Sequence, residues 1–294
     1  AHQALELLLN LVLLPSLEPP AFEIEREVVL EEIAQYKDQP DEQVLQALLG
    51  GIWEEHPYGR PILGIESILK TSQPRQMNAF HKRRYVGENC CISIAGAIPN
   101  GIQEFINNSL LASLDPNNAE GDCFTESNLI FKPGRVEIEV PRLESARLLM
   151  AWPLPPAKEQ EIIMGADLAT SLLAEGRRSR LVQRLREELQ IVESIDMDVT
   201  ILEEGSLVMI EACCPEKQLE KVEIEINDLL KTSKSSIAKQ QELERAVQLV
   251  RNGLCFSLEA SSQVAALAGA QSLWNRTQPL LEPLNQINSW TATR

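Results

Sequence analysis

Apolar residues recur at helical spacing along most of the chain, and shorter runs typical of strands separate the helical stretches. Helices are predicted over residues 2–14, 20–38, 41–54, 65–69, 74–85, 99–114, 158–174, 177–190, 215–232, 238–258 and 260–274. Strands are predicted over residues 90–97, 135–140, 146–152, 194–202 and 206–213. This mixture predicts an α+β protein in which helices cover one face of a largely antiparallel sheet.

The order strand, proline, amphipathic helix occurs twice, in CCISIAGAIPNGIQEFINNSLLASL and in SLVMIEACCPEKQLEKVEIEINDLLKT. The chain is therefore predicted to repeat one α/β unit in tandem. The polar stretch DPNNAEGDCFTESN, residues 115–128, is the best linker candidate because it combines Gly, Pro and Asn. We expect a first domain over residues 1–125 and a second over 126–294.

The helix predicted over residues 20–38 carries two carboxylates among its apolar positions. At helical spacing one stripe gathers Phe22, Val28, Val29, Ile33 and Tyr36. Glu25 and Glu32 lie seven residues apart within this stripe. A buried carboxylate is costly unless it is paired or binds a metal ion. The two acids therefore predict either a metal site or side chains that reach the helix edge and meet an Arg, and the helix alone does not decide between them.

Length and charge narrow the class of protein. The 294 residues suit two medium domains, and a hydrophobic fraction of 44% supports a substantial core. The net charge of −16 argues against partners with phosphate surfaces, so neither nucleic acid nor an anionic membrane is expected. A basic or neutral peptide is compatible with this charge. No GxGxxG or GxxxxGK[ST] pattern occurs, so nucleotide binding has no support.

The six cysteines include two adjacent pairs, CCISIAG and ACCP, in strand-like runs. Neighbouring strand residues point to opposite faces, so an adjacent pair rarely bonds to itself, and no CxxC spacing indicates a zinc finger. Buried free thiols in a reducing compartment, such as the cytoplasm, are therefore predicted. The apolar run LELLLNLVLLP is too short to span a bilayer, and no membrane helix is predicted.

Several motifs occur in an order that resembles a known family. EREVVLEEI, HPYGRPI and YVGENCCISIAGAI resemble the pitrilysin family of zinc metallopeptidases, the inverted zincins that include mitochondrial processing peptidases and bacterial relatives. GRRSRLVQRLREELQIVES resembles the segment of the family's second domain that opens with Gly-x-x-Ser-Arg-Leu. The resemblance covers nearly the whole chain and implies a pitrilysin-like fold, with residues 1–125 as a partial first domain that lacks the His-x-x-Glu-His segment.

The resemblance also implies roles for particular residues. In the family, zinc is held by two His of His-x-x-Glu-His and by a downstream Glu, the last residue of Glu-Arg-x-Val-x-x-x-Glu. That residue is Glu32 here, and the first residue of the pattern, Glu25, matches a supporting acid of the catalytic site. Arg186 matches an Arg that holds substrate, whereas the Tyr that follows seven residues later is replaced by Glu193. A carboxylate donates no hydrogen bond to an oxyanion unless it is protonated.

The chain also departs from the family in its histidines. Only His2, His56 and His81 are present, and none belongs to a His-x-x-Glu-His motif. HPYGRP reads as a structural turn rather than a ligand loop. We therefore expect zinc in the full-length parent, but neither zinc nor activity in the chain as printed.

Two main functions remain open. The acids Glu25 and Glu32 favour the zinc-bearing subunit of a metalloendopeptidase that cleaves peptides or presequences in a two-chain clamshell, where a homologous second subunit supplies Arg and Tyr. The missing Tyr and His motif favour a non-catalytic scaffold or partner subunit of the same fold. An unrelated interaction module fits the order of the motifs less well.

Overall fold

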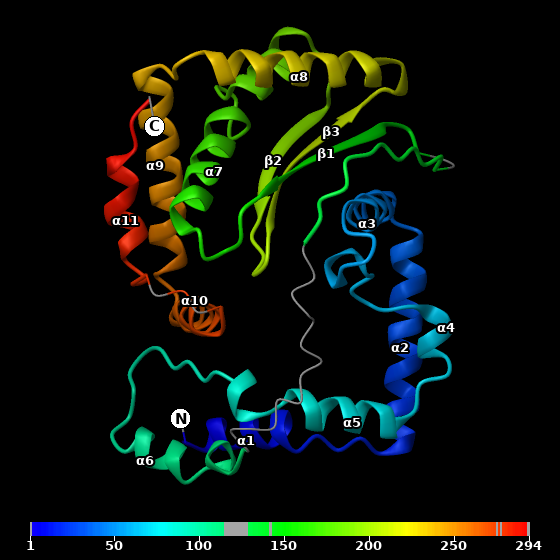
Figure 1. The fold of residues 1–294 in the computed structure, drawn as a ribbon, viewed down its shortest axis with the longest axis vertical. Coiled ribbons are helices and arrows are strands. Elements are labelled where there is room, and N and C mark those ends of the chain that lie inside the picture. The colour runs from blue at the N-terminus through cyan, green and yellow to red at the C-terminus, as the bar shows by residue number, and fades with distance from the viewer. Residues whose placement is uncertain (1, 115–128, 141–142, 275, 277, 293–294) are drawn as a thin grey trace.

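The computed structural model describes residues 2–114, 129–140, 143–274, 276 and 278–292, and the chain forms two units. In the described part of the first unit the regular elements are helices: α1 His2–Leu13, α2 Pro19–Lys37, α3 Pro40–Ile52, α4 Glu66–Leu69, α5 Pro74–Arg84 and α6 Ile102–Asn107. The second consists of β1 Ala146–Leu154, α7 Gln160–Leu173, a π-helix η4 Val182–Glu188, β2 Ser194–Thr200, β3 Ser206–Cys214, α8 Leu219–Ser235, α9 Gln240–Ser257, α10 Ser261–Leu273 and α11 Glu282–Gln286. Figure 1 shows α2 and α3 on one side of the molecule, and α9 and α11 on the other.

Proline sets the starts of the helices in the first unit. Pro stands in the first turn of α2, α3 and α5, where its missing N–H costs no intrahelical hydrogen bond. The helix α2 ends at Lys37, where the N–H of Asp38 donates to the carbonyl of Gln35 and the N–H of Gln39 donates to that of Tyr36. Pro40 then begins α3, so the two helices form a tight corner. The sequence predicted both boundaries of α2 to within one residue.

The sheet is antiparallel, with strand order β1-β3-β2. One face packs on α7, η4 and α8 and forms the main core, which includes the fully buried Leu185, Ile210 and Ile226. The opposite face meets the first unit, where Trp53 and Ile52 from the end of α3 pack against Leu207. An antiparallel sheet with helices packed on one face confirms the predicted α+β class.

Four predicted elements differ from the structure. Residues 90–97 and 135–140 form no strand and belong to no ladder within the described chain, because no described strand lies beside them. Residues 99–114 form only the short α6 and a 3₁₀ turn, Leu110–Ser113. Within 177–190, a turn precedes the π-helix. The predicted linker, 115–128, lies outside the described residues, and the domain limits at 125 and 126 remain a prediction.

The cysteines bear out part of the prediction. All five that the structure describes are free thiols, and Cys213 and Cys214 are buried on opposite faces of β3. Cys91 and Cys255 are exposed, so the prediction of burial is wrong for these two. Cys91 lies in the segment that has no neighbouring strand to cover it. In the part of the chain that the structure describes, no helix is both long and apolar enough to cross a membrane.

Candidate functional site

The helix α2 places Glu25 and Glu32 on one face, as their spacing of two turns requires. Both carboxylates are exposed, and neither makes a hydrogen bond or ion pair with a described residue. The expectation that they lie in a buried stripe is therefore wrong. The side of α2 that packs on the protein centres on Ile33, with half-buried Phe22 and Val29 beside it.

The predicted stripe consists of two adjacent faces. Val28 and Tyr36 lie three and four residues from the acids along the helix, so Glu25, Val28, Glu32 and Tyr36 form one row. Val28 and Tyr36 are exposed, as the acids are. This open row presents two unpaired carboxylates flanked by two apolar side chains.

Two contacts fix the orientation of α2. Arg26, which is largely buried, donates from Nη1 to the carbonyl of Ser72 at 3.5 Å. Lys37 at the end of the helix pairs with Glu66 of α4, which also accepts from Lys70 at 2.6 Å. These two lysines lower the pKa of Glu66 to about 2. The anchors lie off the open row and leave its acids unengaged.

The HPYGRP loop joins the two units. His56 is 7% exposed, and its Nε2 lies 3.1 Å from Oε2 of Glu204 in the β2–β3 turn. Its Nδ1 accepts from the N–H of Tyr58 at 3.2 Å, and the Tyr58 hydroxyl accepts from the N–H of Glu204 at 3.2 Å. Both ring nitrogens of His56 are thus engaged within the protein. The loop therefore forms a turn that is hydrogen-bonded to the β2–β3 turn, which agrees with the prediction of a structural turn rather than a ligand loop.

The Gly-x-x-Ser-Arg-Leu motif shapes the entry to the π-helix. Gly176 has a φ of 77°, a left-handed conformation that favours glycine. The buried Ser179 binds back to the carbonyl of Gly176, through its N–H at 3.0 Å and its hydroxyl at 2.7 Å. Leu181 is fully buried in the main core. The motif therefore makes a compact turn that fixes where the next helix begins.

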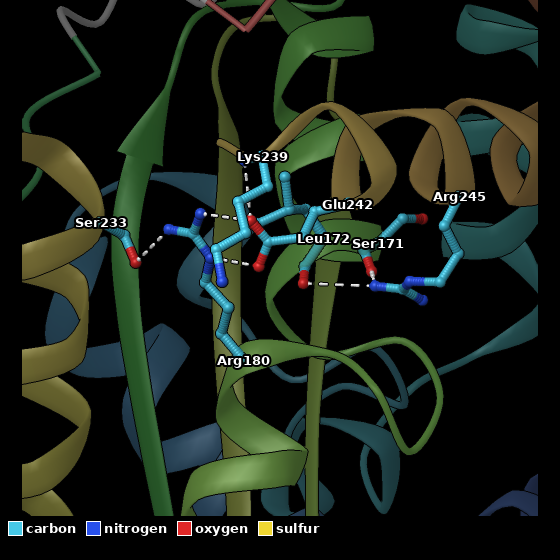
Figure 2. A network of polar contacts seen from close by, with 7 residues as sticks. All are labelled: Ser171, Leu172, Arg180, Ser233, Lys239, Glu242 and Arg245. Atoms are coloured by element: carbon cyan, nitrogen blue, oxygen red, sulfur yellow. Dashed lines mark hydrogen bonds and ion pairs between the residues drawn. The ribbon is translucent and has the colours of Figure 1, made fainter. Parts of the chain in front are cut away.

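Arg180 of this motif ties three elements together (Figure 2). Its guanidinium forms a two-pronged pair with Glu242 of α9, with Nε–Oε1 of 3.1 Å and Nη2–Oε2 of 2.9 Å, and Nη1 donates to Ser233 of α8 at 3.0 Å. Glu242 also accepts from the N–H of Lys239 at 2.9 Å, which caps α9. Beside this pair, Arg245 donates to carbonyls at the end of α7.

Arg186 lies in the π-helix, a rare conformation that often marks functional sites. Five arginines occur in this region: Arg177, Arg178, Arg180, Arg184 and Arg186. Arg177 pairs with Glu187 at 2.8 Å, and Arg184 pairs with Glu225 of α8 at 3.0 Å. Arg186 is exposed and makes no side-chain hydrogen bond with any residue that the structure describes. Its guanidinium is therefore available to a ligand.

Glu193, at the family's Tyr position, is held within the protein. Its Oε1 accepts from the Ser145 hydroxyl at 2.5 Å, and its Oε2 accepts from the Cys213 thiol at 3.4 Å. These two donors lower the pKa of Glu193, so it is ionised at neutral pH and acts only as an acceptor. Arg147 donates to the Cys213 sulfur at 2.8 Å and to Asp41 of α3 at 2.7 Å, which extends the network to the first unit.

The sheet face that meets the first unit is acidic around this network. Asp196 on β2 lies directly opposite Glu211 on β3, and Asp198 follows on the same face. The pKa of Glu211 is raised, first by burial and then by the nearby Asp41 carboxylate. Arg147 shares this face with the three strand carboxylates, so the surface has a negative balance that suits cationic groups of a ligand.

The predicted site residues thus fall into two groups. Glu25 and Glu32 share the open face of α2, whereas Arg186 lies in the second unit. Within the described chain no hydrogen bond or ion pair joins them, and no three His, Cys, Asp or Glu side chains converge to hold a metal ion. The network of Ser145, Cys213 and Arg147 was not predicted from the sequence. The available signal was Arg147, a charged residue inside the otherwise apolar strand ARLLMAWPL.

The Arg180–Glu242 pair predicts a measurable loss of stability in acid. Arg180 lowers the pKa of Glu242 from 4.5 to about 2, so the folded state favours the ionised carboxylate. The stabilisation is complete above pH 4.5 and is lost as the pH falls towards 2, with an upper limit of about 3 kcal/mol. Urea unfolding at several pH values should show a steeper loss in the native protein than in Glu242→Gln. Equal slopes would contradict the assignment.

Comparisons with known proteins agree on one family. The family described as "Peptidase M16 inactive domain" matches residues 73–250, and "Insulinase (Peptidase family M16)" matches residues 1–66. A protein of Mycobacterium tuberculosis named as an uncharacterized zinc protease is 24% identical over 298 residues, covering 98% of this chain and 66% of the relative. A similarly named protein of Bacillus subtilis is 24% identical, with coverage of 98% and 69%. The chain spans about two thirds of the length of these curated relatives.

Solved structures show the same fold. A protease from Helicobacter pylori has a TM-score of 0.85 at 20% identity and covers 99% of this chain and 71% of its own. A peptidase M16 inactive domain from Pseudomonas fluorescens has a TM-score of 0.79 at 18% identity, with coverage of 93% and 65%. Since the inactive-domain match alone spans more than half of the residues, the chain belongs to the peptidase M16 family, the pitrilysin-like family that its motifs resemble.

Proposed function

We propose that this chain contributes part of the active site of an M16 zinc endopeptidase. In this proposal Glu32 is a zinc ligand, Glu25 supports the ligand set, and Arg186 holds the substrate. The carrying observation is the open row on α2, where Glu25 and Glu32 are exposed and have no partner among the described residues. The row lies within the segment that matches the insulinase description, and the matched relatives are named as zinc proteases.

The residues fit a zinc site only in part. A free carboxylate such as Glu32 is a suitable ligand, and Glu25, two helical turns away on the same face, can hydrogen-bond to a neighbouring ligand. Zinc requires three or four ligands, and the printed sequence has no His-x-x-Glu-His to supply the others. The proposal therefore assigns the two His to a segment of the whole protein beyond the printed residues. Bound zinc would supply an activated water for attack on a peptide carbonyl.

The second unit supports a peptide as the substrate. Arg186 is free to donate to a peptide carbonyl, and the acidic sheet face with Asp196 and Glu211 favours a chain with basic groups. Glu193 is an acceptor held by Ser145, so it does not replace the donor that a Tyr would provide. We therefore assign that donor to a homologous second subunit, which would close on this one around the peptide.

A non-catalytic scaffold of the same fold is the second candidate. One chain of "Complex III2 from Candida albicans" matches with a TM-score of 0.71 at 16% identity, which shows the fold alone. The observation that favours this candidate is Glu193, because a scaffold has no need of a donor at this position. The unpaired acids of α2 favour the peptidase, because a scaffold has no need of them either.

Zinc content of the natural full-length protein tests the proposal. We expect one zinc per chain, and Glu32→Gln should weaken zinc binding by at least about 100-fold, because the loss of a direct ligand exceeds the loss of a supporting residue. Glu31→Gln is the matched control, since Glu31 is an exposed neighbour outside the open row. Cleavage of a fluorogenic peptide should fall in parallel with zinc. A full-length protein that binds no zinc would instead support the scaffold.

A further inference from the structure

The helix α3 links the open row on α2 to the sheet of the second unit. It contacts both α2 and β1, and Figure 1 shows it beside the sheet, with α2 leading away from it. The corner between α2 and α3 consists only of Asp38 and Gln39. A contact that fixes the N-terminal end of α3 therefore also fixes the C-terminal end of α2, where Tyr36 of the open row lies.

Two contacts hold α3 on the sheet, one at each end of the helix. At the C-terminal end, Trp53 is buried and packs with Leu207 of β3, which lies opposite Pro153 of β1. At the N-terminal end, Oδ1 of Asp41 pairs with Nε of Arg147 on β1 at 2.7 Å. Arg147 and Pro153 are separated by about 20 Å of strand. Asp41 and Trp53 are separated by about 18 Å of helix, so helix and strand match in length between the two contacts.

The second unit holds the guanidinium of Arg147 in a fixed direction. Its Nη1 donates to the carbonyl of Ser145 at 3.1 Å and to the sulfur of Cys213 at 2.8 Å. The side chain of Arg147 is 21% exposed, whereas that of Asp41 is 59% exposed. Because the guanidinium is planar, the two contacts of Nη1 also orient Nε towards Asp41. Arg147 therefore presents an oriented charge to α3 from a position fixed in the sheet.

Arg147 also balances carboxylates on the two sides of this contact. Glu211 lies on the same face of β3 as Cys213 and stands opposite Asp196 of β2. Burial and then the Asp41 carboxylate raise the pKa of Glu211, whereas the Arg147 guanidinium lowers it. Asp41 on α3 and Glu211 on the sheet therefore repel each other, and Arg147 attracts both. Without Arg147, this repulsion drives the N-terminal end of α3 away from the sheet, while the end at Trp53 remains packed.

We infer that Arg147 is a positioning residue, which holds the corner between α2 and α3 on the sheet and so sets where the open row lies relative to the second unit. Its consequence for catalysis rests on the proposed function, in which Glu32 of α2 and Arg186 of the second unit act on one peptide. A misplacement of about 1 Å between groups that act together can cost about 100-fold in rate. Loss of Arg147 should therefore reduce cleavage without removing a zinc ligand.

Spin-label distances in the natural full-length protein test the geometry. Labels at Glu31 of α2 and Lys221 of α8, both exposed, report the separation of the two units. They are introduced through unnatural amino acids, so the native cysteines remain unlabelled. We expect one narrow distance distribution in the native protein and an added population at longer distance in Arg147→Ala. Arg251→Ala removes an equal charge from an exposed site on α9 and should leave the distribution unchanged.

Salt and a second substitution separate repulsion from a loss of packing. Raising the salt concentration from about 0.1 M to about 1 M shortens the Debye length from about 10 Å to about 3 Å, so it should return Arg147→Ala towards the native distance. Asp41→Asn in the Arg147→Ala background removes the opposing charge and should have the same effect. If Arg147→Ala does not fold, this double variant and Arg147→Lys, which keeps the charge but not the fork, are compared with the native protein instead. In that comparison, Arg147→Lys should show the longer population and the double variant should not.

Activity measures the consequence for the proposed function. Arg147→Ala should keep one zinc per chain and lower kcat for a fluorogenic peptide by about 100-fold, with a smaller change in KM and partial recovery at high salt. An unchanged distance distribution in Arg147→Ala would overturn the inference. A longer distance with an unchanged kcat in the zinc-loaded protein would also overturn it and would leave the proposed function intact. A native full-length protein that binds no zinc would overturn the proposed function, and the distances alone would then decide the inference.

Discussion

Replacing Arg180 by Ala is expected to lower the free energy of unfolding of the second unit by about 2 to 3 kcal/mol. The side chains of Arg180 and Glu242 are 18% and 25% exposed, so removing the guanidinium leaves a mostly buried carboxylate without its charge partner. It also removes the bond to Ser233 and thus the tie between α8 and α9 (Figure 2). Urea unfolding followed by circular dichroism measures the change.

Arg177 offers a matched control within the same motif. It pairs with Glu187 at 2.8 Å, but its side chain is 80% exposed, so Arg177→Ala should leave the free energy of unfolding nearly unchanged. Arg180→Lys should recover only part of the loss, because Lys lacks the fork that reaches both carboxylate oxygens. Equal effects of Arg177→Ala and Arg180→Ala would show that the pair with Glu242 has no special weight.

The contrast between these two arginines explains the form of Gly-x-x-Ser-Arg-Leu. Gly176 adopts the left-handed conformation of the turn, and the Ser179 hydroxyl donates to its carbonyl. Arg180 binds the turn to α8 and α9, and Leu181 is buried in the core. The motif ends where the π-helix begins, so it sets the position of Arg186 without contacting it. This motif, identified by resemblance to a peptidase family, thus orients the π-helix that carries Arg186.

Helices were predictable from the sequence because their signals are local. Proline in the first turn and the spacing of Phe22, Val29 and Ile33 fix α2 without reference to the rest of the chain. The alternation in residues 90–97 predicted a strand, but the described structure has none there. A ladder requires a second strand, and the described chain supplies none beside this segment. A local pattern does not reveal whether such a partner exists.

The candidate site was predictable in identity but not in environment. Glu25 and Glu32 were found by their spacing, yet their burial was misjudged because Val28 and Tyr36 were assigned to the packed face. Spacing alone does not reveal which of two adjacent apolar faces meets the protein. Arg147 and Cys213 were missed because their contact depends on the register of β1 and β3, which no local pattern fixes.

Mixing the full-length protein with a homologous subunit that carries both Arg and Tyr is expected to raise peptide cleavage by about two to three orders of magnitude, the typical effect of one oxyanion donor. Glu193→Tyr in this chain should add little, because under the two-subunit proposal the partner places the donor. The substitution also removes the acceptor for Ser145 and Cys213, so thermal unfolding of the variant provides the control for folding.

Each outcome of the mixing experiment discriminates between the proposals. Full cleavage by the protein alone as a homo-oligomer would refute the need for a second type of subunit. If Glu193→Tyr alone restores activity, the oxyanion donor acts within this chain. The native protein would then lack this donor because Glu193 is an ionised acceptor. A full-length protein that stays inactive with every partner and binds no zinc would identify the fold as a scaffold.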